Sequence, residues 1–248
     1  MRSMRWGKLV VENHRGVPVP RILGLALAVD AAVWTVVYAT IRDLAAAGWG
    51  ALAGLLLVFG VGLVDDLAPP GPRGLRSHLR SIASGRMTTG GLKLLVITGS
   101  SVFVVALQPA RTTYVELVGI VLIAACANVW NGLDVVPGRA LKAFLPAGLA
   151  FLVWGSLEHA PAILGLVVGA LLVLPFDLRE QAMLGDGGSN MLGFAVGIGL
   201  YDQLPDPWVP VGAGVAVALN VVADTVTFSR VIERVSVLRW LDALGRRA

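Results

Sequence analysis

The side chains with the greatest potential for chemistry in this 248-residue sequence fall into three short clusters. The first is the adjacent pair Asp65 and Asp66, in the stretch GLVDDLAPPGP, directly after a long apolar run. Two neighbouring carboxylates at the C-terminal end of a helix repel each other and meet the negative end of the helix dipole. We therefore expect a compensating cation there, either an arginine of the following segment (Arg73, Arg76 or Arg80) or a divalent metal with oxygen ligands.

The second cluster consists of Asn128, Asn131 and Asp134, in the stretch CANVWNGLDVVPG. A spacing of three places these side chains on one side of a continuing helix. An asparagine inside a membrane is costly unless its amide group is hydrogen-bonded. The pattern predicts a polar wall of a cavity that opens to the cytoplasm. The alternative is a set of hydrogen bonds that link neighbouring helices.

The third cluster is the glycine-rich stretch LGDGGSNMLG, with Asp186 between Gly185 and Gly187 and with Ser189 two residues further on. Glycines allow the backbone to approach a ligand closely, and the serine is a typical helix cap. The free N–H groups of a helix N-terminus attract phosphate, and a carboxylate beside them can hold a magnesium ion that bridges phosphate oxygens. This cluster indicates a phosphate and metal site, and the alternative is a plain capped turn.

The composition indicates that membrane helices position these clusters. Hydrophobic residues make up 56% of the sequence, charged residues only 15%, and the mean hydropathy is +0.77. Several apolar blocks approach the roughly 20 residues that cross a bilayer, and the shorter blocks are either spans or buried helices. The expected fold class is all-α, a polytopic integral membrane helical bundle with about eight transmembrane helices. The eight apolar blocks are 22–41, 44–64, 92–107, 115–130, 141–155, 161–176, 189–204 and 207–226.

The basic residues give this bundle an orientation. On the eight-span arrangement, 18 of the 20 Lys and Arg residues fall on one side and only Arg42 and Arg111 on the other. The positive-inside rule makes the richer side cytoplasmic, with both termini inside. All three polar clusters lie on this cytoplasmic side. We expect a single membrane domain over 1–248, with a cytoplasmic N-terminal segment at 1–21 and a cytoplasmic loop at 65–91.

The last segment, 227–248, alternates basic and apolar side chains. This pattern is typical of a cytoplasmic amphipathic tail that lies on the membrane surface, and equally of a helix that caps the bundle. The basic residues are spread over several segments without a recognisable nucleic-acid module, so the expected partners are membrane lipids and no nucleic acid. The single cysteine, Cys126, excludes an internal disulfide.

In their order and on one membrane face, the three clusters resemble the motifs of the polyprenyl-phosphate N-acetylhexosamine-1-phosphate transferases. This superfamily includes the peptidoglycan lipid I synthase and is also called glycosyl transferase family 4. It carries an Asp-Asp pair after a span, an Asn-x-x-Asn-x-x-Asp segment and a Gly-Asp-x-Gly-Ser turn, which read VDDL, NVWNGLD and GDGGS here. The N-terminal ENHRGVPVPRILG and the late VADTVTFSRVIERV are also similar to family segments, so the likeness covers nearly the whole chain.

The resemblance implies a magnesium-dependent enzyme of the bacterial inner membrane with a role in cell wall biogenesis. Such an enzyme transfers a sugar-1-phosphate from a UDP-N-acetylhexosamine to polyprenyl phosphate and releases UMP. Catalytic roles are implied for Asp65, Asp66 and Asp186, with Mg²⁺ held by Asp186 and Asp66. Lys93, with Arg80 as a rival, is implied as the phosphate-facing cation. The implied substrate-binding residues are Asn128, Asn131, Asp134, Lys93, Gly187 and Ser189.

Two other functions are expected as alternatives. The segment after Asp134 and both ends of the chain depart from the usual family pattern, which favours a non-catalytic relative that binds polyprenyl phosphate or scaffolds cell-envelope assembly. A homodimer or an envelope-assembly partner fits the same hypothesis. Asp30, a carboxylate within the first predicted span, favours a small transporter, because an acid inside a membrane is costly and usually functional.

Overall fold

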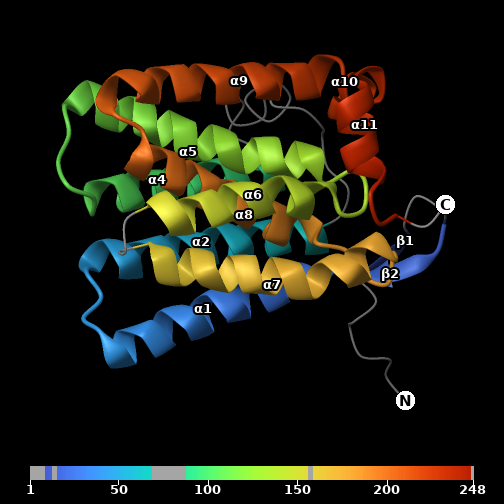
Figure 1. The fold of residues 1–248 in the computed structure, drawn as a ribbon, viewed down its shortest axis with the longest axis horizontal. Coiled ribbons are helices and arrows are strands. Elements are labelled where there is room, and N and C mark those ends of the chain that lie inside the picture. Colours follow the sequence, from blue (N-terminus) through green and yellow to red (C-terminus); the bar gives the residue numbers. More distant parts are fainter. Residues whose placement is uncertain (1–8, 13–15, 69–87, 156–158, 247–248) are drawn as a thin grey trace.

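The fold is a bundle of helices that run roughly parallel or antiparallel to one another (Figure 1). The computed structural model describes residues 9–12, 16–68, 88–155 and 159–246. Each of the eight apolar blocks forms one helix of the bundle, and two short helices follow. In chain order the helices are α1 Leu23–Ile41, α2 Ala46–Leu67, α4 Thr89–Ala106, α5 Thr113–Leu133, α6 Arg139–Trp154, α7 Ala160–Leu178, α8 Gly185–Gln203, the 3-10 helix η2 Asp206–Trp208, α9 Val209–Thr225, α10 Phe228–Arg234 and α11 Ser236–Ala243.

Six of these helices are long and apolar enough to cross a membrane, so the prediction of an all-α polytopic membrane bundle is confirmed. The predicted count of eight spans is not established. Of the eight helices formed by the apolar blocks, the two outside the six are α6, which has only 16 residues, and α8, which carries Asp186 and several glycines. Helix α8 is buried inside the bundle, where a less apolar segment is tolerated, whereas α6 packs on one side against α7 and α8 and has Val153 and Trp154 exposed.

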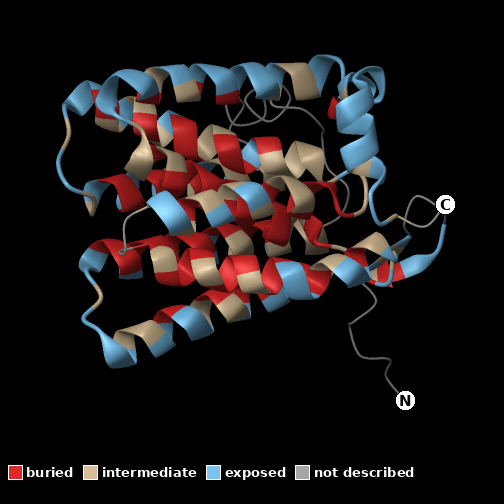
Figure 2. Ribbon diagram, viewed as in Figure 1, coloured by how far each residue is buried: buried red, intermediate tan, exposed pale blue. Residues whose placement is uncertain are grey.

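Helix α8 is the centre of the bundle. It packs against α1, α2, α5 and α6, and nearly all of its residues are buried. Figure 2 shows buried residues on the inner helices and exposed residues along the outer face of α9 and on the C-terminal helices. Because the outward-facing side chains of α1 and α9 include many valines and leucines, these helices are suited to contact lipid.

Glycines bring the start of α8 close to two other helices. A Cβ atom on Gly62 of α2 would lie 2.5 Å from the Cα of Gly187, and one on Gly24 of α1 would lie 2.7 Å from the backbone nitrogen of Gly188. Real side chains do not fit at such distances, so these positions require glycine. The glycine-rich turn of the third cluster is thereby fixed against α1 and α2.

A two-stranded antiparallel hairpin precedes α1, which the sequence did not predict. Its strands are β1 Val10–Glu12 and β2 Pro18–Pro20, with Val10 paired to Pro20. After β2, the backbone of Arg21 forms a parallel bridge with Met183, and the Met183 N–H donates to the Pro20 carbonyl at 2.8 Å. The N-terminal arm is therefore bound to the segment that leads into α8.

Asp30 lies on α1 where this helix packs along α7. A Cβ atom on Gly169 of α7 would lie 2.8 Å from an Asp30 carboxylate oxygen, so the small residue makes room for the acid. This position fits a helix–helix contact, and nothing around it assigns a transport role.

A candidate active site at one end of the bundle

The three predicted clusters meet at the end of the bundle where α2 and α5 finish and where α4, α6 and α8 begin (Figure 1). Asp65 and Asp66 occupy the last turn of α2, which extends to Leu67. Asp186 lies in the first turn of α8, and Lys93 lies in the second turn of α4. Of the predicted compensating cations, Arg73, Arg76 and Arg80 lie outside the described residues.

Lys93 is the cation that joins two of the three carboxylates. Its Nζ lies 2.7 Å from Asp186 Oδ2 and 3.1 Å from Asp65 Oδ2. The start of α4 fixes its position, because the Thr88 side chain caps the helix by accepting a hydrogen bond from the Gly91 N–H at 3.0 Å. The Lys93 side chain is only 12% exposed, whereas that of Asp186 is 35% exposed and open to a ligand. We refer to Asp65, Asp66, Asp186 and Lys93 as the carboxylate centre.

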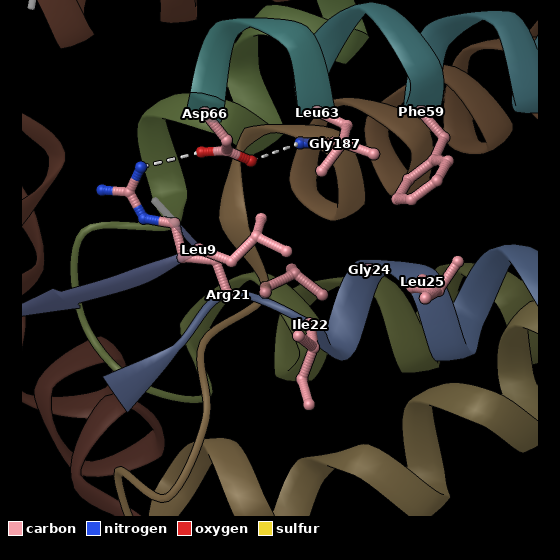
Figure 3. A pocket seen from close by; sticks show the side chains of 10 residues that line it. Leu9, Arg21, Ile22, Gly24, Leu25, Phe59, Leu63, Asp66 and Gly187 are labelled. Carbon is pink, nitrogen blue, oxygen red and sulfur yellow. Dashed lines mark hydrogen bonds and ion pairs between the residues drawn. The ribbon is translucent and has the colours of Figure 1, made fainter. Parts of the chain in front are cut away.

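Asp66 has a different set of partners from its neighbour Asp65. Arg21 Nη1 donates to Asp66 Oδ1 at 2.9 Å, and the Gly187 N–H donates to Asp66 Oδ2 at 3.3 Å (Figure 3). The Asp66 side chain is 4% exposed. It therefore links the N-terminal arm to the first turn of α8. Gly185 has a φ of +72°, and a Cβ atom there would lie 2.7 Å from Asp66 Oδ2, so glycine is required on two grounds.

A small apolar niche of about 60 Å³ adjoins the Arg21–Asp66 pair. Figure 3 shows Phe59, Leu63 and Leu25 around it, with the ion pair at one end. This volume is far below the roughly 300 Å³ at which ligand pockets begin, so the niche does not hold a nucleotide.

A second cavity, of about 390 Å³, lies between the end of α5, the end of α9 and the start of α10. Its size falls within the range of pockets for small ligands. We refer to it as the α5–α10 cavity. Its lining residues are Asn128, Asn131, Gly132, Val135, Ala223, Asp224, Thr227, Phe228 and Ser229.

The two asparagines of the second cluster form hydrogen bonds with different helices. Asn128 Nδ2 donates to Asn220 Oδ1 of α9 at 2.5 Å, and Asn220 Nδ2 donates in turn to the carbonyl of Ala125 at 3.0 Å. Asn128 thus links α5 to α9 while lining the cavity. The Ser189 hydroxyl donates to Asn131 Oδ1 at 3.1 Å, and this contact connects the α5–α10 cavity to the first turn of α8. Ser189 itself is fully buried.

Asp134 ends α5 and stands near other acids. The residue as a whole is partly exposed, but its carboxyl group is surrounded by protein. This burial, together with the negative charges of Asp177, Asp186 and Asp66, raises the pKa of Asp134 well above its usual range. Among the described residues, no group of three or more His, Cys, Asp or Glu side chains is gathered closely enough to enclose a metal ion.

The comparison with known families covers the part of the chain that holds this site. The family model for glycosyl transferase family 4 matches residues 48–202, more than half of the chain. The chain belongs to glycosyl transferase family 4. The matched segment contains Asp65, Asp66, Asp186 and the second cluster, so the resemblance noted in the sequence is confirmed at the level of the family. Among curated proteins no match is found. Membership in this family supports a membrane phosphoglycosyl transferase.

Sequence reasoning missed three residues that build the site. Arg21 was counted only as a basic residue, although it binds Asp66 across 45 positions of sequence. Asp177, a buried acid, accepts a hydrogen bond from the Gly138 N–H at 2.7 Å and so holds the turn after Asp134. Arg139 follows that turn and is also buried. The available signal was a charged residue at the border of an apolar block, but sequence spacing does not reveal its partner.

Proposed function

We propose that this protein transfers a sugar-1-phosphate from a UDP-N-acetylhexosamine to polyprenyl phosphate at the cytoplasmic face of the bacterial inner membrane. In the reaction, an oxygen of the polyprenyl phosphate forms a bond to the β-phosphorus of the donor. The bond between that phosphorus and the bridging oxygen breaks, and UMP leaves with this oxygen. The products are polyprenyl-diphospho-sugar and UMP.

The observation that carries the proposal is the convergence of three carboxylates with Lys93 at one end of a membrane bundle. Both substrates are anionic, so the reaction needs cations and N–H donors that lower the repulsion between the phosphates. Lys93 and Arg21 supply positive charge, and the start of α8 supplies backbone N–H groups. The α5–α10 cavity, connected to α8 through Asn131 and Ser189, is large enough to receive part of the donor.

The donor set fits Mg²⁺. This ion is usually held by one or two carboxylates together with substrate phosphates and water, and it does not need an all-protein cage. Asp65 and Asp186 share one cation, the Lys93 ammonium, so their oxygens are directed at a common point of positive charge. Asp66 faces Arg21 and the Gly187 N–H instead. We assign Asp186, whose side chain is 35% exposed, as a metal-holding residue, and Asp66 as the second one because the family resemblance implies it. When bound, the ion would neutralise charge on the donor diphosphate.

The experiment that tests the proposal is an assay of UMP release. Purified protein in nanodiscs is incubated with Mg²⁺, polyprenyl phosphate and a panel of UDP-N-acetylhexosamines. We expect release that depends on both Mg²⁺ and the acceptor, and that is lost in Asp66→Asn and Asp186→Asn. The matched control is Asp43→Asn, which changes an exposed acid in the turn between α1 and α2.

The same assay separates the alternative function. If folded protein binds polyprenyl phosphate but releases no UMP with any donor, the result would contradict catalysis and support a lipid-binding relative. Loss of activity in Asp43→Asn as well would show that the effect is not specific to the carboxylate centre.

A further inference from the structure

We propose that Arg139 is a positioning residue that latches α10 and α11 onto the turn between α5 and α6, and that this latch sets one wall of the α5–α10 cavity. One part of this proposal rests on the proposed function, namely that the nucleotide-sugar donor occupies this cavity. The latch itself rests on the contacts of Arg139, Lys142, Ser229 and Asp242.

Arg139 binds both C-terminal helices at once. Its Nε lies 2.8 Å from Asp242 Oδ1 and its Nη2 lies 3.0 Å from Asp242 Oδ2, which is a bidentate pair with α11. Its Nη1 donates to the Ser229 hydroxyl of α10 at 3.0 Å. The Arg139 side chain is 7% exposed and that of Asp242 is 10% exposed. A buried bidentate pair of this kind fixes the relative orientation of its partners.

Lys142 adds a second attachment one turn along α6. Its Nζ donates to the backbone carbonyls of Leu241, Asp242 and Leu244 at 3.0, 2.6 and 3.2 Å. These carbonyls lie at the C-terminal end of α11, where a cation is favoured by the helix dipole. Arg246 also pairs with Asp242. The Asp242 carboxylate is thus surrounded by guanidinium groups.

Apolar packing does not hold α11 in place. None of its residues is buried, and Val237 and Trp240 are 66% and 62% exposed. In α10 only Phe228 is buried. Figure 1 shows α11 turning away from the direction of α9 and running across the end of the bundle. Within the described part of the chain, the attachment of α11 to the bundle is therefore polar and depends on Arg139 and Lys142.

The latched segment forms a wall of the cavity. Thr227, Phe228 and Ser229 line it, and Ser229 is the residue that Arg139 binds. The Phe228 ring packs on the end of α5, since a Cβ atom on Gly132 would lie 3.0 Å from it. The anchor is firm because Gly138, next to Arg139, is tied to Asp177.

The carboxylate centre does not depend on the latch. It is built on α2, α4 and α8, whereas the wall comes from residues beyond 202, where the family match ends. Release of the latch should therefore weaken contacts with the donor and leave the acceptor and the chemical step unchanged.

The test combines a distance measurement with substrate kinetics on the full chain in nanodiscs. Spin labels are attached to cysteines at Val135, which lines the cavity, and at Glu233, on α10, with Cys126 replaced by alanine throughout. We expect a narrow distance distribution in the parent and a broad one in Arg139→Gln. The control is Arg239→Gln, an exposed arginine on α11, which should keep the narrow distribution.

In kinetics, we expect Arg139→Gln to raise the KM for the UDP-sugar by about tenfold, which corresponds to a loss of about 1.4 kcal/mol in donor binding. The KM for polyprenyl phosphate and the kcat at saturating donor should stay at the parent values. If Arg139→Gln does not fold, Asp242→Asn serves as the second variant.

A narrow distribution in Arg139→Gln or Asp242→Asn would overturn the latch. Equal changes in the KM for both substrates would overturn its positioning role. If no UDP-sugar supports turnover, the result contradicts the proposed function and not the latch. The distance distribution then decides alone whether the latch exists.

Discussion

Replacing Lys93 with methionine is the most informative single change at the carboxylate centre. Methionine keeps the unbranched side chain but removes the ammonium group that Asp65 and Asp186 share at 3.1 and 2.7 Å. Exposed ion pairs contribute up to about 1 kcal/mol, and breaking a buried pair costs about 3–5 kcal/mol. The Asp65 and Asp186 side chains are 21% and 35% exposed, so this centre lies between the two limits. We expect a loss of about 1–3 kcal/mol in the free energy of unfolding.

The effect on activity should be larger than the effect on stability. If Lys93 faces the donor diphosphate in the transition state, its removal should lower kcat by about 10²–10³, as for loss of other preorganised donors. Lys93→Arg keeps the charge and serves as the control, with a smaller loss. The assays are UMP release and thermal unfolding with and without Mg²⁺.

Mg²⁺ gives a second readout for the same variant. Without the ammonium group, the Asp65 and Asp186 carboxylates hold an uncompensated negative charge. Mg²⁺ should therefore raise the unfolding temperature of Lys93→Met more than that of the parent. A variant with reduced stability but full activity, or one that Mg²⁺ does not stabilise, would refute the reasoning.

Three further predictions concern the surroundings of the site. Gly187→Ala should destabilise the fold by about 1–3 kcal/mol in thermal unfolding, because its Cβ would lie 2.9 Å from the Phe59 carbonyl, whereas Gly60→Ala, which meets open space, should not. Asp134→Asn should stabilise the protein at neutral pH, because the folded-state pKa of Asp134 is raised and the ionised carboxyl is therefore unfavourable in the fold. The contribution of Asp134 to stability is present below about pH 4 and is lost as the pH rises, so unfolding measured against pH should show this slope in the parent and not in the variant. Burial alone would raise the pKa of Asp242, but Arg139 and Arg246 hold it below its usual value. The latch should therefore stabilise the protein above about pH 4 and weaken as the pH falls through the lowered pKa. Proteolysis of the tail should become faster in acid for the parent, and its rate in Asp242→Asn should not depend on this pH change.

The sequence predicted the architecture well because membrane helices have a strong local signal. Each apolar block formed one helix, and the order of the polar clusters matched the family that the comparison confirmed. The two blocks that fall short as spans, α6 and α8, show the limit of this signal. The burial of α8 and the packing of α6 on α7 and α8 come from contacts with other helices, which hydropathy does not describe.

The partners within the site were less accessible to sequence reasoning. The dipole argument required a cation beside Asp65 and Asp66, and the structure provides two, Lys93 and Arg21. Lys93 was one of the two candidates for the phosphate-facing cation, whereas Arg21 was not predicted at this site. The pairing of Arg21 with Asp66 depends on a hairpin and on a backbone bridge to Met183, which form only when distant segments meet. The pairing of Arg139 with Asp242 spans 103 positions and likewise forms only when distant segments meet.

The roles of the site residues stay predictions, and one measurement tests them most directly. The donor is a UDP-N-acetylhexosamine labelled at its β-phosphorus, and the label is followed after extraction of lipids. The account predicts that the label enters a lipid diphosphate in amounts equal to the UMP released, and that Asp186→Asn abolishes this transfer without unfolding the protein. Label that remains in water-soluble products, or transfer that persists in Asp186→Asn, would contradict the account.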